Sequence, residues 1–290
     1  MLDANTFSNK NVVNYTNQNF IPFKINAESK SGMKLFNQFK GTGYPFMIFI
    51  DSNNNEIERL YGYLPPENFI TKLENITKGV DTFSDLHGKY LLGDKSAETM
   101  FILANKALIR GDDSLSIVLY NSVIIHKNVS WDMFHQSKVG LGKIYLKSDQ
   151  LDLKNYIDEF PESPLIKESV NTLLSYYQSK DMQSSEIKLY SNYLNKFIND
   201  PWFLNQFSWR MAELELDLEN ALQKINVALD IVLEDKEKRA MILDTKAEVF
   251  WKLQKYDDAT QTSSIILQIV SPYLLNHAFV RRCYIFLNSL

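Results

Sequence analysis

Apolar residues follow two different patterns along the chain, and the change between the patterns falls near residue 80. Before it, residues 20–25 and 45–50 are short apolar runs, which predict two largely buried strands. Pro22 has no backbone N–H group, so we expect the first strand to be poorly paired on one side, as at a sheet edge. Residues 56–61 alternate polar with apolar side chains, which predicts a third strand.

Turns and helices connect these predicted strands. The stretch 51–55 consists of Asp, Ser and three Asn residues, which favours a hairpin between the second and third strands. Apolar residues recur at helical spacing in 33–39, and Pro65 begins a further helix with apolar residues on one face up to Ile76. With another helix before residue 20, the predicted order is helix, strand, helix, strand, strand, helix.

Beyond residue 80, apolar positions have helical spacing almost throughout, and short turns separate the predicted helices. Residues 141–145 read Leu-Gly-Lys-Ile-Tyr and resemble the L-G-x-x-Y pattern in the first helix of a tetratricopeptide repeat (TPR). Ala221 and Ala259 lie 38 positions apart, close to the roughly 34-residue period of that repeat. We therefore expect about four or five divergent helical hairpins stacked as a TPR-like solenoid, with a general helical bundle as the alternative.

Several segments of the first part resemble the later part of a thioredoxin-like fold. They are residues 6–9, 19–26, 43–51 and 58–63. In that family a G-Y-P-T segment supplies a cis proline that faces the active dithiol, and the neighbouring backbone pairs with substrate peptide. The resemblance implies that Pro45 is this proline and that Tyr44, Pro45 and Phe46 bind substrate or peptide. Phe46 departs from the family pattern, which usually has Thr at this position.

A larger departure concerns the start of the fold. Family members place a strand, the W-C-x-x-C motif and a helix before the position equivalent to Thr6. That strand is normally central, between the equivalents of 20–25 and 45–50. Here Met1 comes just after the place of the motif, so we expect these two strands either to leave a gap or to pair with each other. The chain is then either an N-terminally shortened form of a longer protein or a naturally degenerate domain.

Length, charge and hydropathy set further limits. A chain of 290 residues fits two domains, which we place at 1–80 (partial thioredoxin-like) and 81–290 (TPR-like). The predicted fold class is mixed α and β, mostly α: a truncated thioredoxin-like α/β domain followed by an α-helical TPR-like solenoid. The net charge is −4 without a basic stripe, so we do not expect a nucleic-acid partner.

No apolar run approaches the roughly 20 residues that a membrane span needs. No signal peptide is visible, which predicts a cytoplasmic location for the chain as written, or a periplasmic or exported one if a longer N-terminus exists.

Candidate chemistry is sparse. The single cysteine, Cys283, excludes an internal disulfide, and we expect it to be a buried thiol in a terminal helix. The four histidines show no ligand spacing, so neither a metal nor a cofactor is expected. Asp112 and Asp113 are expected to cap a helix rather than to act as acid and base. The four tryptophans are expected to fill the core between helices rather than to anchor a groove.

These observations lead to one functional hypothesis and one alternative. The hypothesis is a non-catalytic thioredoxin-like and TPR-like interaction module for a protein or peptide client, related to thiol–disulfide handling proteins. The alternative is an N-terminally shortened form of an active thiol–disulfide oxidoreductase whose C-x-x-C motif lies upstream of Met1.

Overall fold

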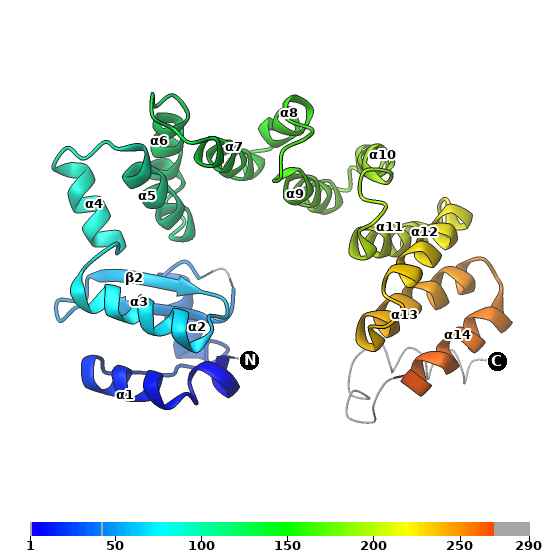
Figure 1. The fold of residues 1–290 in the computed structure, drawn as a ribbon, viewed down its shortest axis with the longest axis horizontal. Coiled ribbons are helices and arrows are strands. Elements are labelled where there is room, and N and C mark those ends of the chain that lie inside the picture. The colour runs from blue at the N-terminus through cyan, green and yellow to red at the C-terminus, as the bar shows by residue number, and fades with distance from the viewer. Residues whose placement is uncertain (1, 42, 270–290) are drawn as a thin grey trace. The chain divides into compact units, whose positions relative to one another are not determined.

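The computed structural model describes residues 2–41 and 43–269, and the chain divides into two compact units, Met1–Leu173 and Leu174–Leu290. Figure 1 shows the elements in chain order. They are a short π-helix (Leu2–Thr6), α1 (Lys10–Asn19), α2 (Lys30–Gln38), β1 (Phe46–Ile50), β2 (Glu56–Tyr61), α3 (Pro66–Lys78), α4 (Phe83–Leu91), α5 (Ala97–Ile109), α6 (Asp113–Ile124), α7 (Trp131–Leu146), α8 (Asp152–Glu159), α9 (Ile166–Ser179), α10 (Gln183–Tyr193), α11 (Pro201–Leu214), α12 (Leu218–Ile231), α13 (Lys236–Lys252) and α14 (Tyr256–Ile269). The predicted class, a small part with strands and helices followed by a mostly helical region, is confirmed. The predicted division at residue 80 stays a prediction.

The predicted hairpin is present. Strands β1 and β2 pair antiparallel, with Phe46 opposite Tyr61, and they make up the sheet of the described residues. The carboxylate of Asp51 holds the connecting turn, because one of its oxygens accepts hydrogen bonds from the backbone N–H of Asn53 at 2.9 Å and of Asn55 at 2.8 Å. At the turn, side-chain hydrogen bonds of Asp51 thus take the place of backbone hydrogen bonds between the strands, as the polar residues of the sequence indicate.

The predicted strand at 20–25 is wrong. Residues 21–26 are extended but exposed, and the side chains of Ile21 and Phe23 are each 84% accessible. No backbone hydrogen bond joins residues 21–25 to another described residue. The physical reason is the lack of a neighbouring strand, since a strand needs a hydrogen-bonding partner and Pro22 cannot donate at all. Of the two expected outcomes, pairing of 20–25 with the strand at 46–50 is not observed in the described residues.

One face of the hairpin is covered by helices. Val12 of α1 and Phe69 and Leu73 of α3 are buried together, and Met47 and Phe49 of β1 pack against them. Helices α1 and α3 also contact each other. In both helices, the regularly spaced apolar residues therefore form the face that is buried against the hairpin.

Buried charges join the hairpin to the helices that follow it in the first unit. Glu58 of β2 is 3% exposed and forms ion pairs with Lys106 of α5 and, at 3.1 Å, with Arg110, the residue directly after α5. Its carboxylate also accepts hydrogen bonds from the backbone N–H of Phe83 at 3.2 Å and from that of Arg59 at 2.9 Å. Burial lowers the pKa of the Arg110 guanidinium, and the negative charges of Glu56 and Glu58 oppose this shift.

Helices at a nearly constant spacing make up the described chain from residue 97 to residue 269. The first helices α5, α7, α9, α11 and α13 begin at residues 97, 131, 166, 201 and 236, so successive starts are 34 or 35 residues apart. Four of them pack closely on the helix that follows: α5 on α6, α7 on α8, α11 on α12 and α13 on α14. Helices α9 and α10 occupy the remaining interval (Figure 1). Within residues 97–269, the four packed helix pairs agree with the predicted four or five helical hairpins.

Small residues mark the points at which paired helices come close. The hydroxyl of Ser116 in α6 donates to the backbone oxygen of Ala104 in α5 at 3.1 Å, and both residues are fully buried. Ser208 in α11 donates in the same way to the backbone oxygen of Ala221 in α12 at 2.9 Å. Gly142 of the L-G-x-x-Y segment meets Leu153 of α8, and an added Cβ would lie 2.9 Å from the Cβ of Leu153. The sequence prediction that glycine allows a close approach is confirmed.

A buried histidine lies between α7 and α8. The side chain of His135 is 3% exposed, and its Nδ1 lies 3.0 Å from the hydroxyl of Tyr156, which in turn lies 2.6 Å from that of Ser163. Aromatic rings surround the imidazole, with the ring of Phe160 at 4.8 Å. Burial lowers the pKa of His135, although the charges of two nearby carboxylates oppose the shift.

This histidine predicts a loss of stability in mild acid. A pKa below the ordinary value of about 6.5 means that the unfolded chain binds the proton more tightly than the folded chain does. The stabilising contribution is therefore complete above about pH 6.5 and decreases as the pH falls below that value. Urea unfolding at pH 7.5 and pH 5.5 is expected to show a lower midpoint in acid, and the difference should be smaller in His135→Asn. Equal differences in the two proteins would contradict this assignment.

Candidate functional site

Tyr44, Pro45 and Phe46, which the sequence suggests for peptide binding, lie at the start of β1. The peptide bond between Tyr44 and Pro45 is cis, and the backbone oxygen of Pro45 accepts a hydrogen bond from Gly62 at 3.0 Å. The ring of Tyr44 is 64% exposed and lies 5.0 Å from the ring of Phe36 in α2. The ring of Phe46 lies 5.8 Å from the same Phe36 ring. The three residues therefore place one exposed aromatic side chain directly before β1.

The backbone of β1 has one side without a partner strand. Residues in an antiparallel ladder alternate between pairs that exchange hydrogen bonds and pairs that do not. Because Pro45 accepts a bond from Gly62, the residue directly after β2, the backbone groups of Met47 and Phe49 face β2, and those of Phe46 and Ile48 face away. Within residues 2–41 and 43–269, no strand pairs with this outward side, which we call the β1 edge. Its N–H and C=O groups can bond to an incoming chain.

The corresponding side of β2 is covered. The backbone N–H of Arg59, which faces away from β1, donates to the carboxylate of Glu58. At the start of α4, the hydroxyl of Ser84 donates to the backbone oxygen of Glu56 at 3.2 Å, and the backbone of Phe83 donates to Glu58. Helix α4 and a buried carboxylate thus occupy this side of the hairpin. The β1 edge is the open one.

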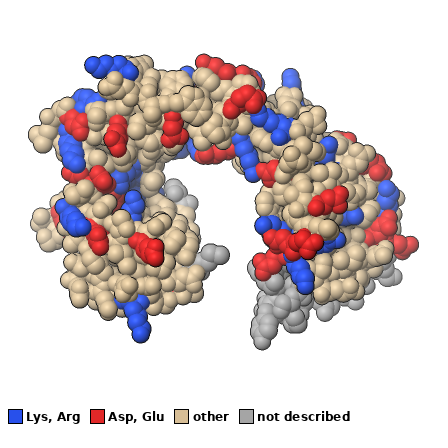
Figure 2. Space-filling model, viewed as in Figure 1, with Lys and Arg blue, Asp and Glu red and all other residues tan. Residues whose placement is uncertain are grey.

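The part of the chain that contains β1 has exposed apolar side chains and more lysines than acidic residues. The ring of Phe20 lies 5.5 Å from the ring of Phe49, so the exposed segment 21–25 starts beside β1. Its Ile21 and Phe23 are large apolar side chains exposed to solvent, as is Tyr44 directly before β1. Residues 2–50 also contain five lysines against two acidic residues, although the whole chain has a net charge of −4. Elsewhere acidic and basic side chains are interspersed over the helices on the face drawn in Figure 2.

The match to known proteins covers this same part of the chain. Residues 1–77 match the family model of the thioredoxin-like domain. Comparison with curated proteins gives no match. The thioredoxin-like segment, residues 1–77, ends one residue before the end of α3, and a helical region follows it. The segment contains no cysteine, since the single cysteine of the sequence is at position 283.

The other candidate residues of the sequence do not assemble into a reactive site. In the part of the chain that the structure describes, no group of three or more His, Cys, Asp or Glu side chains could hold a metal ion. No helix of the described ranges combines the length and apolar composition of a membrane span. Asp112 caps α6 by accepting the backbone N–H of Leu115 at 3.1 Å, as predicted. Cys283 and the predicted terminal helix around it lie outside the described residues.

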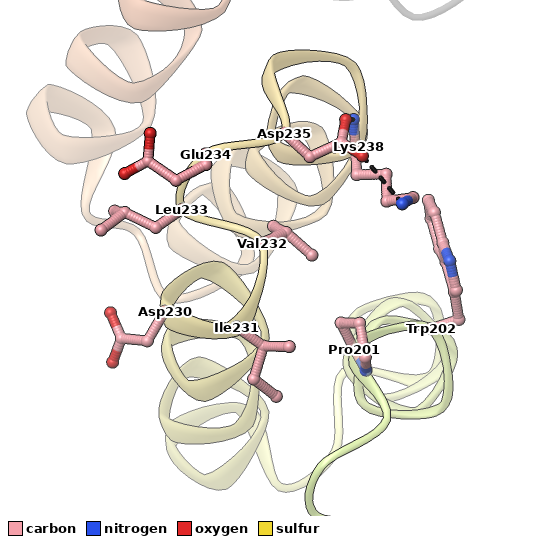
Figure 3. Close-up of a pocket in the computed structure, with 9 residues that line it drawn as sticks. All are labelled: Pro201, Trp202, Asp230, Ile231, Val232, Leu233, Glu234, Asp235 and Lys238. Carbon is pink, nitrogen blue, oxygen red and sulfur yellow. Dashed lines mark hydrogen bonds and ion pairs between the residues drawn. The ribbon is translucent and has the colours of Figure 1, made fainter.

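A pocket of about 500 Å³ lies in the second unit, between the start of α11 and the end of α12 (Figure 3). Trp202 and Lys238 stand on one side of it, and Lys238 forms an ion pair with Asp235 at 2.8 Å. Asp235 also caps α13 by accepting the backbone N–H of Lys238. These polar groups therefore have structural roles in holding the start of α13.

The prediction that the tryptophans fill the core is wrong for two of them. Trp131 and Trp202 are 57% and 37% exposed. Both lie in the first turn of a helix, α7 and α11, where a side chain has fewer neighbours than in the middle of a packed pair.

Two features of the first unit were not anticipated from the sequence. The buried ion pairs of Glu58 were missed, although adjacent charged residues in the middle of a strand, Glu58 and Arg59, are a signal that could have indicated them. The open β1 edge was considered only as one of two outcomes of the missing strand. Deciding between the outcomes requires the positions of residues 20–25 relative to β1.

Proposed function

We propose that this chain is an interaction protein that binds protein or peptide clients through its thioredoxin-like segment and its helical hairpins, without dithiol chemistry of its own. The observation that carries the proposal is the open β1 edge next to the exposed ring of Tyr44. Unpaired strand edges and exposed aromatic rings are features of peptide-binding surfaces. The absence of a cysteine in residues 1–77 argues against disulfide exchange by this segment.

The helical region supports the same proposal. We interpret the hairpins as TPR-like, because first helices recur every 34 or 35 residues and buried small residues lie at the helix crossings. Arrays of this kind contain no intrinsic chemistry, and they commonly bind an extended peptide or a partner helix. A chain that joins two binding parts can hold one client at two points, which increases the overall affinity.

Peptide binding tests the role of Tyr44. Peptides selected from a random displayed library against the purified full chain should bind the chain in solution. For some of these peptides, Tyr44→Ala should reduce the affinity about ten-fold, as loss of a central aromatic contact does. Tyr63→Ala is the matched control, since Tyr63 is an exposed tyrosine of the same segment beyond β2. Binding would be measured by calorimetry.

A redox assay provides the second arm of this test. The chain should not accelerate the reduction of insulin by dithiothreitol, and Cys283→Ser should behave identically. Failure to select any binding peptide would contradict the interaction role. Turnover in the insulin assay would contradict the non-catalytic role.

A further inference from the structure

We infer that the pocket at the end of α12 binds an arginine side chain presented by a protein client. The inference rests on the proposed function and specifies a class of client for the helical hairpins, a segment that carries an arginine among uncharged residues. Three features of the pocket carry it: free backbone acceptors, a wall of aromatic and aliphatic side chains, and a negative local charge. All of them belong to the second unit.

Backbone oxygens at the end of α12 have no hydrogen-bond donor from the described chain. The helix ends at Ile231, and residues 230 to 235 line the pocket. Within the described residues, the oxygens of Leu229, Asp230 and Ile231 accept no hydrogen bond. They form the negative end of the helix dipole, and the last turn contains no basic residue. The pocket therefore favours an occupant that is positively charged and donates several hydrogen bonds.

An aromatic ring and aliphatic side chains form the wall of the pocket. Figure 3 shows Ile231 and Val232 directed toward the side on which Trp202 stands. Trp202 is 37% exposed and Ile231 is 44% exposed, so both offer apolar surface to an occupant. A guanidinium group is flat and stacks on aromatic rings, and its aliphatic chain would lie on Ile231. A lysine ammonium is a compact charge and matches a flat ring less well.

The charges around the pocket favour a cation. Three acidic residues and one basic residue line it, and the basic residue, Lys238, is neutralised by its ion pair with Asp235. The positive ends of α11 and α13 are each capped by an aspartate. Asp230 and Glu234 are exposed and form no ion pair with another described residue. Figure 3 shows their carboxylates directed away from Trp202, so they attract a cation from a distance rather than by contact.

Other occupants satisfy only part of the pocket. An apolar side chain would cover Trp202 and Ile231 but would leave the oxygens at the end of α12 buried without donors, which costs free energy. A carboxylate would meet backbone oxygens and acidic side chains of its own sign. An arginine brings N–H donors for the oxygens, a flat face for the ring and a positive charge.

Blocked peptides that differ in one side chain test the inference on the full chain. The probe is Gly-Leu-Arg-Leu-Gly with an acetylated start and an amidated end, so the arginine carries its only charge. Its affinity, measured by titration followed by nuclear magnetic resonance, should exceed that of the citrulline peptide at least about ten-fold, because citrulline keeps the shape and loses the charge. Lysine at this position should bind more weakly than arginine, and norleucine more weakly than lysine.

Tryptophan variants locate the binding site. Trp202→Ala should weaken binding of the probe about ten-fold, and Trp202→Phe should retain most of the affinity, because phenylalanine keeps an aromatic face. The matched control is Trp131→Ala, since Trp131 is another exposed tryptophan in the first turn of a first helix. In the parent chain, the indole N–H resonance of Trp202 should shift on titration, and that of Trp131 should stay unchanged.

Charge variants test the attraction from a distance. Asp230→Asn with Glu234→Gln should weaken binding of the probe about three-fold at low salt and much less at high salt. The control is Asp217→Asn with Glu219→Gln, two exposed acidic residues at the start of α12, roughly 20 Å away along the helix. Equal effects of the two double variants would contradict the role of Asp230 and Glu234.

The outcomes separate this inference from the proposed function. Equal binding of the arginine and citrulline peptides, or tighter binding of the norleucine peptide, would overturn the assignment of a cation. Equal losses in Trp202→Ala and Trp131→Ala would show that the probe binds elsewhere. No binding of the probe by a chain that does bind library peptides would overturn the inference and leave the interaction role intact.

Discussion

Replacing Glu58 by alanine is expected to lower the free energy of unfolding of the first unit by about 3 to 5 kcal/mol, the usual result of removing one partner from a buried ion pair. Glu58 and Glu56 are the two carboxylates that pair with the cations Arg59, Lys106 and Arg110. Without Glu58 these three positive charges share one carboxylate in a largely desolvated place. The backbone N–H groups of Arg59 and Phe83, which donate hydrogen bonds to Glu58, would also lose their acceptor.

The measurement combines urea unfolding with hydrogen exchange. Exchange in β2, α4 and α5 should become faster in Glu58→Ala, because the lost bonds connect these elements. Glu58→Gln keeps the volume and an acceptor oxygen and should cost less. Glu74→Ala is the control for a surface pair: Glu74 is 41% exposed and pairs with Lys78 at 3.4 Å, which predicts a change below about 1 kcal/mol. A similar small loss for Glu58→Ala would show that the ion pairs contribute little to stability.

The substitution Gly142→Ala is the second change with a large expected effect. The added Cβ would lie 2.9 Å from the Cβ and 3.0 Å from the Cα of Leu153, which is fully buried in α8. Because one of these atoms belongs to the backbone, α7 and α8 must move apart to accept the methyl group. Overpacking of this kind costs about 1 to 3 kcal/mol, although alanine is intrinsically the better helix former.

Gly88→Ala provides a control with the opposite sign. Gly88 is in α4, and a Cβ added there meets no atom within 4 Å. Alanine should therefore stabilise this helix by roughly 0.5 to 1 kcal/mol. Urea unfolding of both variants and of the parent chain measures the difference. Stabilisation by both substitutions would mean that α7 and α8 are not held as closely as described.

The local sequence pattern was sufficient for the hairpin and for the helical array. Asp51 and the asparagines after it make the turn by bonds within five residues, so no distant partner is needed. The recurring helices follow from helical spacing and from capping residues such as Asp112. In Leu141 to Tyr145 even a contact between helices is encoded locally, because glycine at the crossing is what allows it.

The segment 20–25 shows where local pattern fails. Its residues have high strand propensity, but a strand exists only when another backbone accepts and donates its hydrogen bonds. The local sequence does not indicate whether a neighbouring strand is present to pair with these residues. The same limit applies to the tryptophans at helix starts, whose exposure depends on which element lies opposite.

The sequence by itself determined the hairpin, the series of helices and the absence of a cysteine pair, since each of these depends on composition or on neighbours within a few turns. Only the tertiary structure decided that no described strand pairs with the β1 edge, that α4 covers the other side of the hairpin and that Glu58 pairs with Lys106 and Arg110. The contacts of Glu58 join residues 25 to 52 positions apart, and a linear pattern does not specify such contacts.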